Sequence, residues 1–117
     1  MKRNMDLVRS ILMRIEDSPL GGAVPPFRLQ GLTPEQIRYH VHLMAEDGLI
    51  EDAEVTPGKS TGSDQVPQVL TAKGHDFLDL ARDRDRWNQA HRIIRKVGSA
   101  PIAVWMQVLK DLLLKDL

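Results

Sequence analysis

Histidine and carboxylate side chains are the groups of this sequence that could bind a metal ion or transfer a proton. His42 and Glu46 lie four residues apart, as do His75 and Asp79, so each pair would share one face of a helix. Two ligands make no metal site, and the sequence places no third ligand beside either pair. The chain also has no cysteine, no nucleophile motif and no phosphate-binding glycine loop. We therefore predict a non-enzymatic protein that holds no metal and no cofactor.

A different chemistry, contact with DNA, is suggested by residues 33–50, which read T-P-E-Q-I-R-Y-H-V-H-L-M-A-E-D-G-L-I. Arg38 has the planar donor pair that suits a guanine edge, and Tyr39 and His42 could reach phosphates from the same helix face. Two interpretations stay open: a DNA-contacting helix, or a helix of a winged-helix scaffold that contacts another protein. The second is favoured by three acids on or beside this face, which would repel phosphate: Glu35, Glu46 and Asp47.

The element that must position these side chains is a helix predicted over residues 33–47. Thr33 can cap the helix with its hydroxyl, and Gly48 ends it because glycine adopts the left-handed conformation without strain. Leu49 and Ile50 then turn back into the core. His40 is expected at the edge of that core. Apolar residues at three- and four-residue spacing should form the buried stripe of the helix: Ile37, Val41, Met44 and Ala45.

A first helix is predicted over residues 5–17, with Asn4 as its N-cap. The following stretch is too rich in proline for a helix, and we predict that Phe27 and Leu29 form a short edge strand there. A standard winged helix-turn-helix has a second helix at this place. We expect none before Thr33.

Beyond the central helix, strands are predicted near residues 53–56 and 68–70, and the turn-rich segment between them would be a wing. Thr71 should cap the next helix. Across residues 82–86 the apolar stripe lapses, so a break is expected there. The helix after the break should carry these apolar residues: Trp87, Ala90, Ile93, Ile94 and Val97.

Four phrases of the sequence, in this order, resemble a known bacterial and bacteriophage family. They are M-K-R-N-M-D-L-V-R-S-I-L at residues 1–12, I-R-Y-H-V-H-L-M-A-E-D-G-L-I at 37–50, L-T-A-K-G-H-D-F-L-D at 70–79 and R-W-N at 86–88. The family is called domain of unknown function 2513, and the resemblance covers nearly the whole chain. It implies a winged-helix-like fold without an established activity and without catalytic residues.

More distantly, residues 37–50 are similar to the recognition helix of arsenical-repressor-type regulators. That resemblance implies that Gln36, Arg38, Tyr39 and His42 face double-stranded DNA. Lys59, in the predicted wing, completes the set of residues that we expect to contact DNA.

The last helix, which should run from Ser99 and Pro101 almost to Leu117, is the best candidate for a partner surface. Its apolar stripe is wider than one small core needs, and symmetric dimers are the commonest oligomers. The alternative is that this helix packs on the other helices of the same chain. The homodimer interface would be formed by Trp105, Val108, Leu109, Leu112 and Leu113.

The bulk composition limits the function classes. The 117 residues suffice for one domain, and 16 basic residues balance 16 acidic ones. This neutrality weighs against a dedicated nucleic-acid binder, which usually carries a basic excess. No apolar run has the length of a membrane span, so we expect a cytoplasmic protein without membrane contact.

The predicted fold is mainly α with a small β-hairpin: a winged helix-turn-helix-like core over residues 1–81 and a C-terminal helical extension over 83–117. The leading function is a non-enzymatic, DNA-associated or regulatory protein of bacterial or phage origin. The alternative is a protein-interaction module that does not bind DNA.

Overall fold

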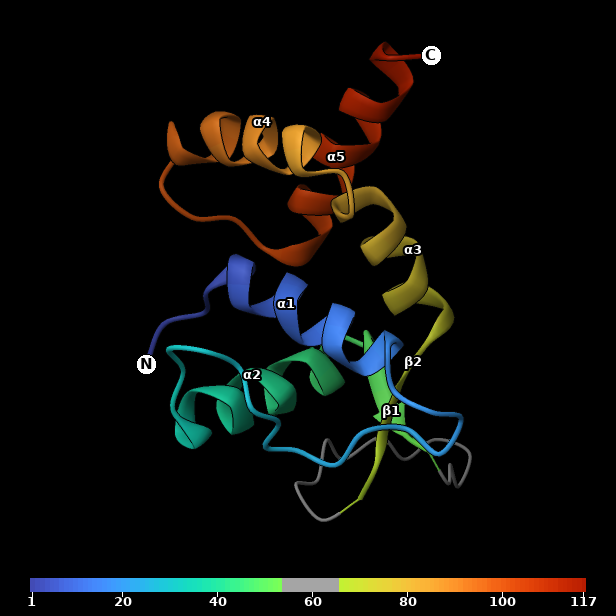
Figure 1. Ribbon diagram of the computed structural model, residues 1–117. Helices are drawn as coiled ribbons and strands as arrows, with labels where there is room; N and C mark the ends of the chain where they lie inside the picture. The colour runs from blue at the N-terminus through green and yellow to red at the C-terminus, as the bar shows by residue number, and fades with distance from the viewer. Residues whose placement is uncertain (54–65) are drawn as a thin grey trace. The chain divides into compact units, whose positions relative to one another are not determined.

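The structure is a computed structural model that describes residues 1–53 and 66–117. Figure 1 shows its helices and strands along the chain. The chain divides into two compact units, an N-terminal unit over Met1–His75 and a C-terminal unit over Asp76–Leu117. The division falls inside helix α3 (Ala72–Ala81), whereas the sequence pattern places it after residue 81. Five helices and one antiparallel pair of strands in the described residues confirm a mainly α fold with a small hairpin.

Helix α1 (Met5–Glu16) begins where the sequence predicts, because Asn4 caps it. The Asn4 side-chain oxygen accepts hydrogen bonds from the backbone N–H groups of Asp6, at 2.9 Å, and Leu7, at 3.3 Å. These bonds satisfy donors that have no partner inside the helix. The helix contacts α2 and β2. Its buried residues recur at helical spacing: Met5, Leu7, Val8, Ile11, Leu12 and Ile15.

Helix α2 (Pro34–Glu46) also has the predicted ends. Thr33 and Gln36 form a reciprocal capping box at its start. At its end Gly48 has a φ of 78°, which turns the chain back toward the core. Leu49 and Ile50 follow at once and are fully buried. The apolar stripe predicted for this helix is buried as well, together with His40.

The small sheet pairs β1 (Ile50–Asp52) with β2 (Gln68–Leu70) in antiparallel register, with Ile50 opposite Leu70. Strand β1 thus lies before the predicted range 53–56, of which the structure describes only Ala53. Leu49 and Ile50 are the buried pair that follows Gly48, and β1 begins at the second of them. Thr56 and Lys59 lie outside the described residues.

A third chain segment joins the sheet at one residue. Ala23 and Gln68 exchange both backbone hydrogen bonds, at 3.1 and 2.7 Å, so β2 lies between Ala23 and β1. The predicted strand at Phe27 and Leu29 is wrong, because the strand-like contact forms earlier in the loop. Phe27 is buried, with the Arg14 guanidinium 5.5 Å from its ring centroid. Residues 17–33, all described, contain no helix, as expected.

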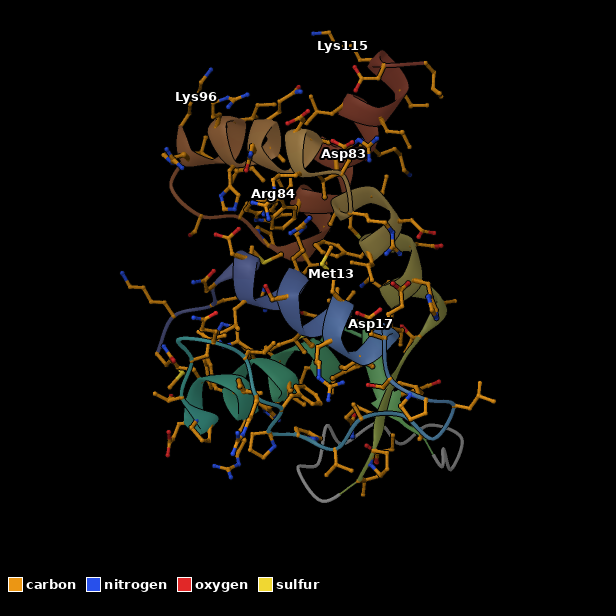
Figure 2. All side chains as sticks on the ribbon, viewed as in Figure 1. Met13, Asp17, Asp83, Arg84, Lys96 and Lys115 are labelled. Atoms are coloured by element: carbon orange, nitrogen blue, oxygen red, sulfur yellow. The ribbon has the colours of Figure 1, made fainter. Side chains whose placement is uncertain are left out.

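The C-terminal unit is built around stacked aromatic rings. After the break at Arg82, Asp83 caps α4 (Arg84–Arg95), and Lys96 lies at the far end of that helix (Figure 2). Helix α5 (Ile102–Lys115) packs on α4. The rings of Trp87 and Trp105 stack with centroids 4.8 Å apart. Such a stack buries a large apolar area and orients the two helices against each other.

Two residues of the predicted apolar stripe are exposed: Ile93 on α4, and Val97 in the turn that follows this helix. Ile93 is 43% exposed and Val97 is 76% exposed. The inward face of the helix is set by Trp87, Ala90 and Ile94, which are all buried. Because Ile93 precedes Ile94 by one residue, it is turned about 100° away from that face.

We predict that Gly74→Ala destabilises the N-terminal unit by about 1–3 kcal/mol. A Cβ atom at Gly74 would lie 2.0 Å from the backbone oxygen of Leu49, so helix α3 would have to move away. Urea unfolding followed by far-UV circular dichroism measures the loss. Gly21→Ala is the control, since a Cβ atom there meets nothing within 4 Å. Equal stability of the two variants would contradict the close approach.

Candidate functional site

The outward face of α2 brings together three of the residues predicted to contact DNA. Arg38, Tyr39 and His42 are all exposed, and Tyr39 is 37% accessible. They lie opposite the buried stripe that contains Ile37 and Val41. The face thus combines a guanidinium, a phenol and an imidazole.

Gln36, the fourth residue predicted on α2, takes part in the capping box at the start of the helix. The Oε1 atom of Gln36 accepts a hydrogen bond from the backbone N–H of Thr33 at 2.9 Å. The backbone N–H of Gln36 donates to the Thr33 hydroxyl at 3.2 Å. The side-chain oxygen is therefore held at the start of the helix. The T-x-x-Q spacing of residues 33–36 is the sequence signature of this arrangement.

Two of the three acids near this face, Glu46 and Asp47, have partners within the chain. The His42 Nε2 atom lies 2.7 Å from a Glu46 carboxylate oxygen, one helical turn away. An Arg3 guanidinium nitrogen lies 3.1 Å from a carboxylate oxygen of Asp47. The Arg3 pair offsets one of the negative charges that would otherwise oppose a phosphate, although such partly exposed pairs are weak.

His40 fixes the position of α2 relative to the start of α1. The ring is 2% exposed. Its Nε2 atom accepts a hydrogen bond from the backbone N–H of Asn4 at 2.9 Å, and Nδ1 lies 2.8 Å from the backbone oxygen of Gln36. Both contacts are satisfied by a neutral ring with its proton on Nδ1. Sequence reasoning placed His40 only at the edge of the core, although its spacing to Ile37 and Met44 matches the buried stripe.

Within residues 1–53 and 66–117, no group of three histidine, aspartate or glutamate side chains is placed so that it could hold a metal ion. The His42–Glu46 pair is an isolated contact. Within the same residues, no helix is long and apolar enough to cross a membrane.

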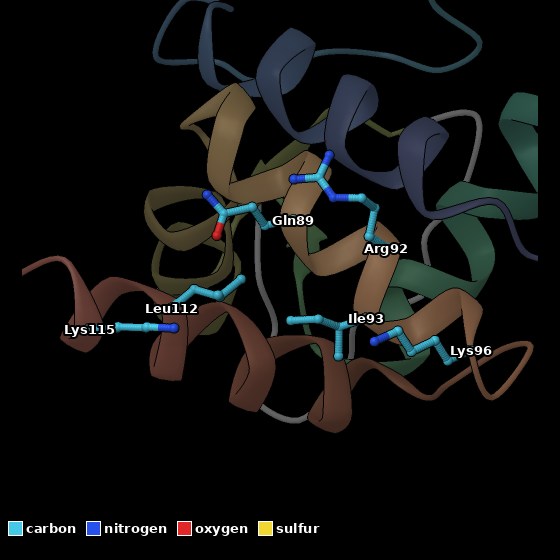
Figure 3. Close-up of a pocket in the computed structure, with 6 residues that line it drawn as sticks. All are labelled: Gln89, Arg92, Ile93, Lys96, Leu112 and Lys115. Carbon is cyan, nitrogen blue, oxygen red and sulfur yellow. The ribbon is translucent and has the colours of Figure 1, made fainter.

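A second surface of interest lies between α4 and α5. Of the residues predicted to form a homodimer interface, Trp105 and Leu109 are buried in the C-terminal unit, while Val108, Leu112 and Leu113 are partly accessible. Leu112 contributes to a pocket of about 400 Å³ (Figure 3). The pocket is lined by Gln89, Arg92, Ile93, Lys96, Leu112 and Lys115.

The α2 face and the α4–α5 pocket thus belong to a helical protein with one small antiparallel sheet. The chain belongs to the family described as "Hypothetical protein (DUF2513)", whose model matches residues 2–100. This confirms the family predicted from the four sequence phrases. The chain is also similar to an uncharacterized protein of Haemophilus influenzae, with 34% identity over 96 residues that cover 81% of this chain and 80% of that protein. No solved structure matches the chain.

We predict that His40→Phe destabilises the protein by about 1–3 kcal/mol, because the backbone N–H of Asn4 loses its acceptor in a partly buried position and the Gln36 backbone oxygen loses its contact with the ring. Phenylalanine keeps most of the ring volume, so the loss reports on hydrogen bonding. Urea unfolding by far-UV circular dichroism measures it. His42→Phe is the matched control, and its effect should stay within about 0.5 kcal/mol because that side chain is exposed. Similar losses in both variants would refute the anchoring role of His40.

We also predict that Leu109→Glu unfolds the C-terminal unit, with a loss of more than about 3 kcal/mol, because it places a carboxylate in a fully buried position. Leu114→Glu on the same helix should be tolerated, since Leu114 is exposed. Thermal unfolding compares the two. A folded Leu109→Glu variant would show that this side chain is accessible.

Proposed function

We propose that this protein is a non-enzymatic, DNA-associated regulatory protein that binds double-stranded DNA through the outward face of α2. The observation that carries the proposal is the exposed set of Arg38, Tyr39 and His42 on a helix whose opposite side is anchored by His40. A helix held in this way presents its side chains in a fixed geometry. The ordering cost of contacting a rigid duplex is therefore small.

The order of the elements supports a winged-helix-like arrangement. Helix α1, the Ala23 bridge, α2, β1 and β2 follow one another, and β2 lies between Ala23 and β1. This order resembles a winged helix-turn-helix domain, in which a hairpin follows the helix that enters the major groove. This chain differs from such a domain over residues 17–33, which are irregular here and form a further helix in such domains.

The side chains of this face suit a division between base and phosphate contacts. The Arg38 guanidinium matches the O6 and N7 acceptors of guanine. The hydroxyl of Tyr39 suits a phosphate oxygen, which positions the protein without reading sequence. The proposal assigns the protein to the cytoplasm, where bacterial DNA lies.

Fluorescence anisotropy of a labelled, mixed-sequence DNA duplex tests the proposal. The protein should bind saturably at low salt and more weakly at moderate salt, because phosphate contacts release counterions. Arg38→Ala should weaken binding about tenfold, the expected effect of losing one base-contacting guanidinium.

Lys110→Ala is the matched control, since it removes one exposed cation from α5 and should leave DNA affinity unchanged. Absence of binding at low salt with tens of micromolar protein would refute the proposal. An equal loss in both variants would show that only net charge matters and that the α2 face has no special role.

A further inference from the structure

The pocket between α4 and α5 combines an apolar floor with cations. Lys96 and Lys115 extend toward each other from opposite sides of the pocket, and Ile93 and Leu112 lie between them (Figure 3). Arg92 also lines it. Among the ion pairs of the described residues, none includes Arg92, Lys96 or Lys115. The pocket therefore offers positive charge at the border of an apolar surface.

Further apolar residues, outside the lining of the pocket, lie near Ile93 and Leu112 in the sequence. Ile93 lies on α4 and Val97 lies in the turn just after that helix, whereas Val104, Val108 and Leu112 are spaced four residues apart along α5. Three of these five residues are clearly exposed, since Val104 is 42% accessible in addition to Ile93 and Val97. We refer to the five residues as the apolar strip. On α5 alone it extends about 12 Å, which is a little over two helical turns.

Acidic side chains are missing from the lining of the pocket as described. Asp111, next to Leu112 in the sequence, accepts a hydrogen bond from the Gln107 amide at 2.8 Å and does not line the pocket. A ligand that pairs carboxylates with an apolar edge would thus meet complementary groups. Such a ligand would cover the apolar strip and place negative charge near Lys96 and Lys115.

Two other occupants fit this surface less well. A second copy joined symmetrically at the pocket would bring the lysines of both chains together, and like charges at an interface are unfavourable. A DNA backbone would satisfy Lys96 and Lys115, but its charged phosphates would leave the apolar strip without a matching surface.

The geometry points to a docking site for an acidic amphipathic helix of a partner protein, held between α4 and α5. The apolar edge of that helix lies on the strip, in the helix-in-groove mode of recognition. Its flanking carboxylates pair with the ammonium groups of Lys96 and Lys115. This site lies in the C-terminal unit and does not depend on DNA binding by α2.

The test uses two fluorescein-labelled peptides of about 14 residues, both with leucines at helical i, i+4 and i+7 spacing. One peptide carries flanking glutamates, and the other carries lysines at the same positions. In anisotropy titrations the wild-type protein should bind the glutamate peptide and bind the lysine peptide at least about tenfold more weakly. The double variant Lys96→Glu/Lys115→Glu should reverse this preference.

The double variant Arg95→Glu/Lys110→Glu is the matched control. It makes the same change in net charge, with one substitution on each helix, but neither residue lines the pocket. It should keep the wild-type preference, and circular dichroism should show both double variants folded. Ile93→Gln should weaken binding of the glutamate peptide by about tenfold, while the protein still prefers it to the lysine peptide.

Three results would overturn the proposal. The first is equal affinity of the wild-type protein for both peptides, and the second is failure of the exchanged charges to reverse the preference. The third is loss of self-association or of DNA affinity in Lys96→Glu/Lys115→Glu but not in the control. That result would assign the pocket to a second copy or to phosphate contacts.

Discussion

The N-terminal unit depends on one buried imidazole. His40 accepts a hydrogen bond from the backbone N–H of Asn4, 36 residues earlier in the chain, and contacts the backbone oxygen of Gln36, so it joins the start of α1 to α2. The same Asn4 caps α1 with its side chain, and the same Gln36 closes the capping box of α2. Local and long-range hydrogen bonds therefore meet at three residues. A buried imidazole is costly unless both of its nitrogens are satisfied, and this requirement favours one orientation of α2.

The ends of the elements could be predicted where a local signal defines them. Asn4, Thr33 and Gly48 act within a few residues of their own positions, and the structure has all three in the predicted roles. The bridge between Ala23 and Gln68 has no such signal, because it depends on how a proline-rich loop passes the sheet. Single-residue pairing of that kind follows from tertiary packing.

The candidate surfaces also contain residues whose exposure the sequence predicts and residues whose exposure it does not. Helical spacing alone placed Arg38, Tyr39 and His42 on one outward face, since the opposite stripe is plainly apolar. The exposure of Ile93 could not be predicted, because an apolar residue beside a core position looks like part of the core. Only the packing of Trp87 against Trp105 shows which side of α4 is inward. The neutral total charge likewise hides the three cations that line the pocket between α4 and α5.

The distribution of aromatic residues gives each unit its own intrinsic chromophore. Both tryptophans of the chain, Trp87 and Trp105, lie in the C-terminal unit, and the single tyrosine, Tyr39, lies on α2 of the N-terminal unit. Indole emission therefore reports on the helical pair, because its two sources are stacked on each other. Phenol absorbance reports on the outward face of α2. The two halves of the protein can be followed separately in one sample, without labels and without altering the sequence.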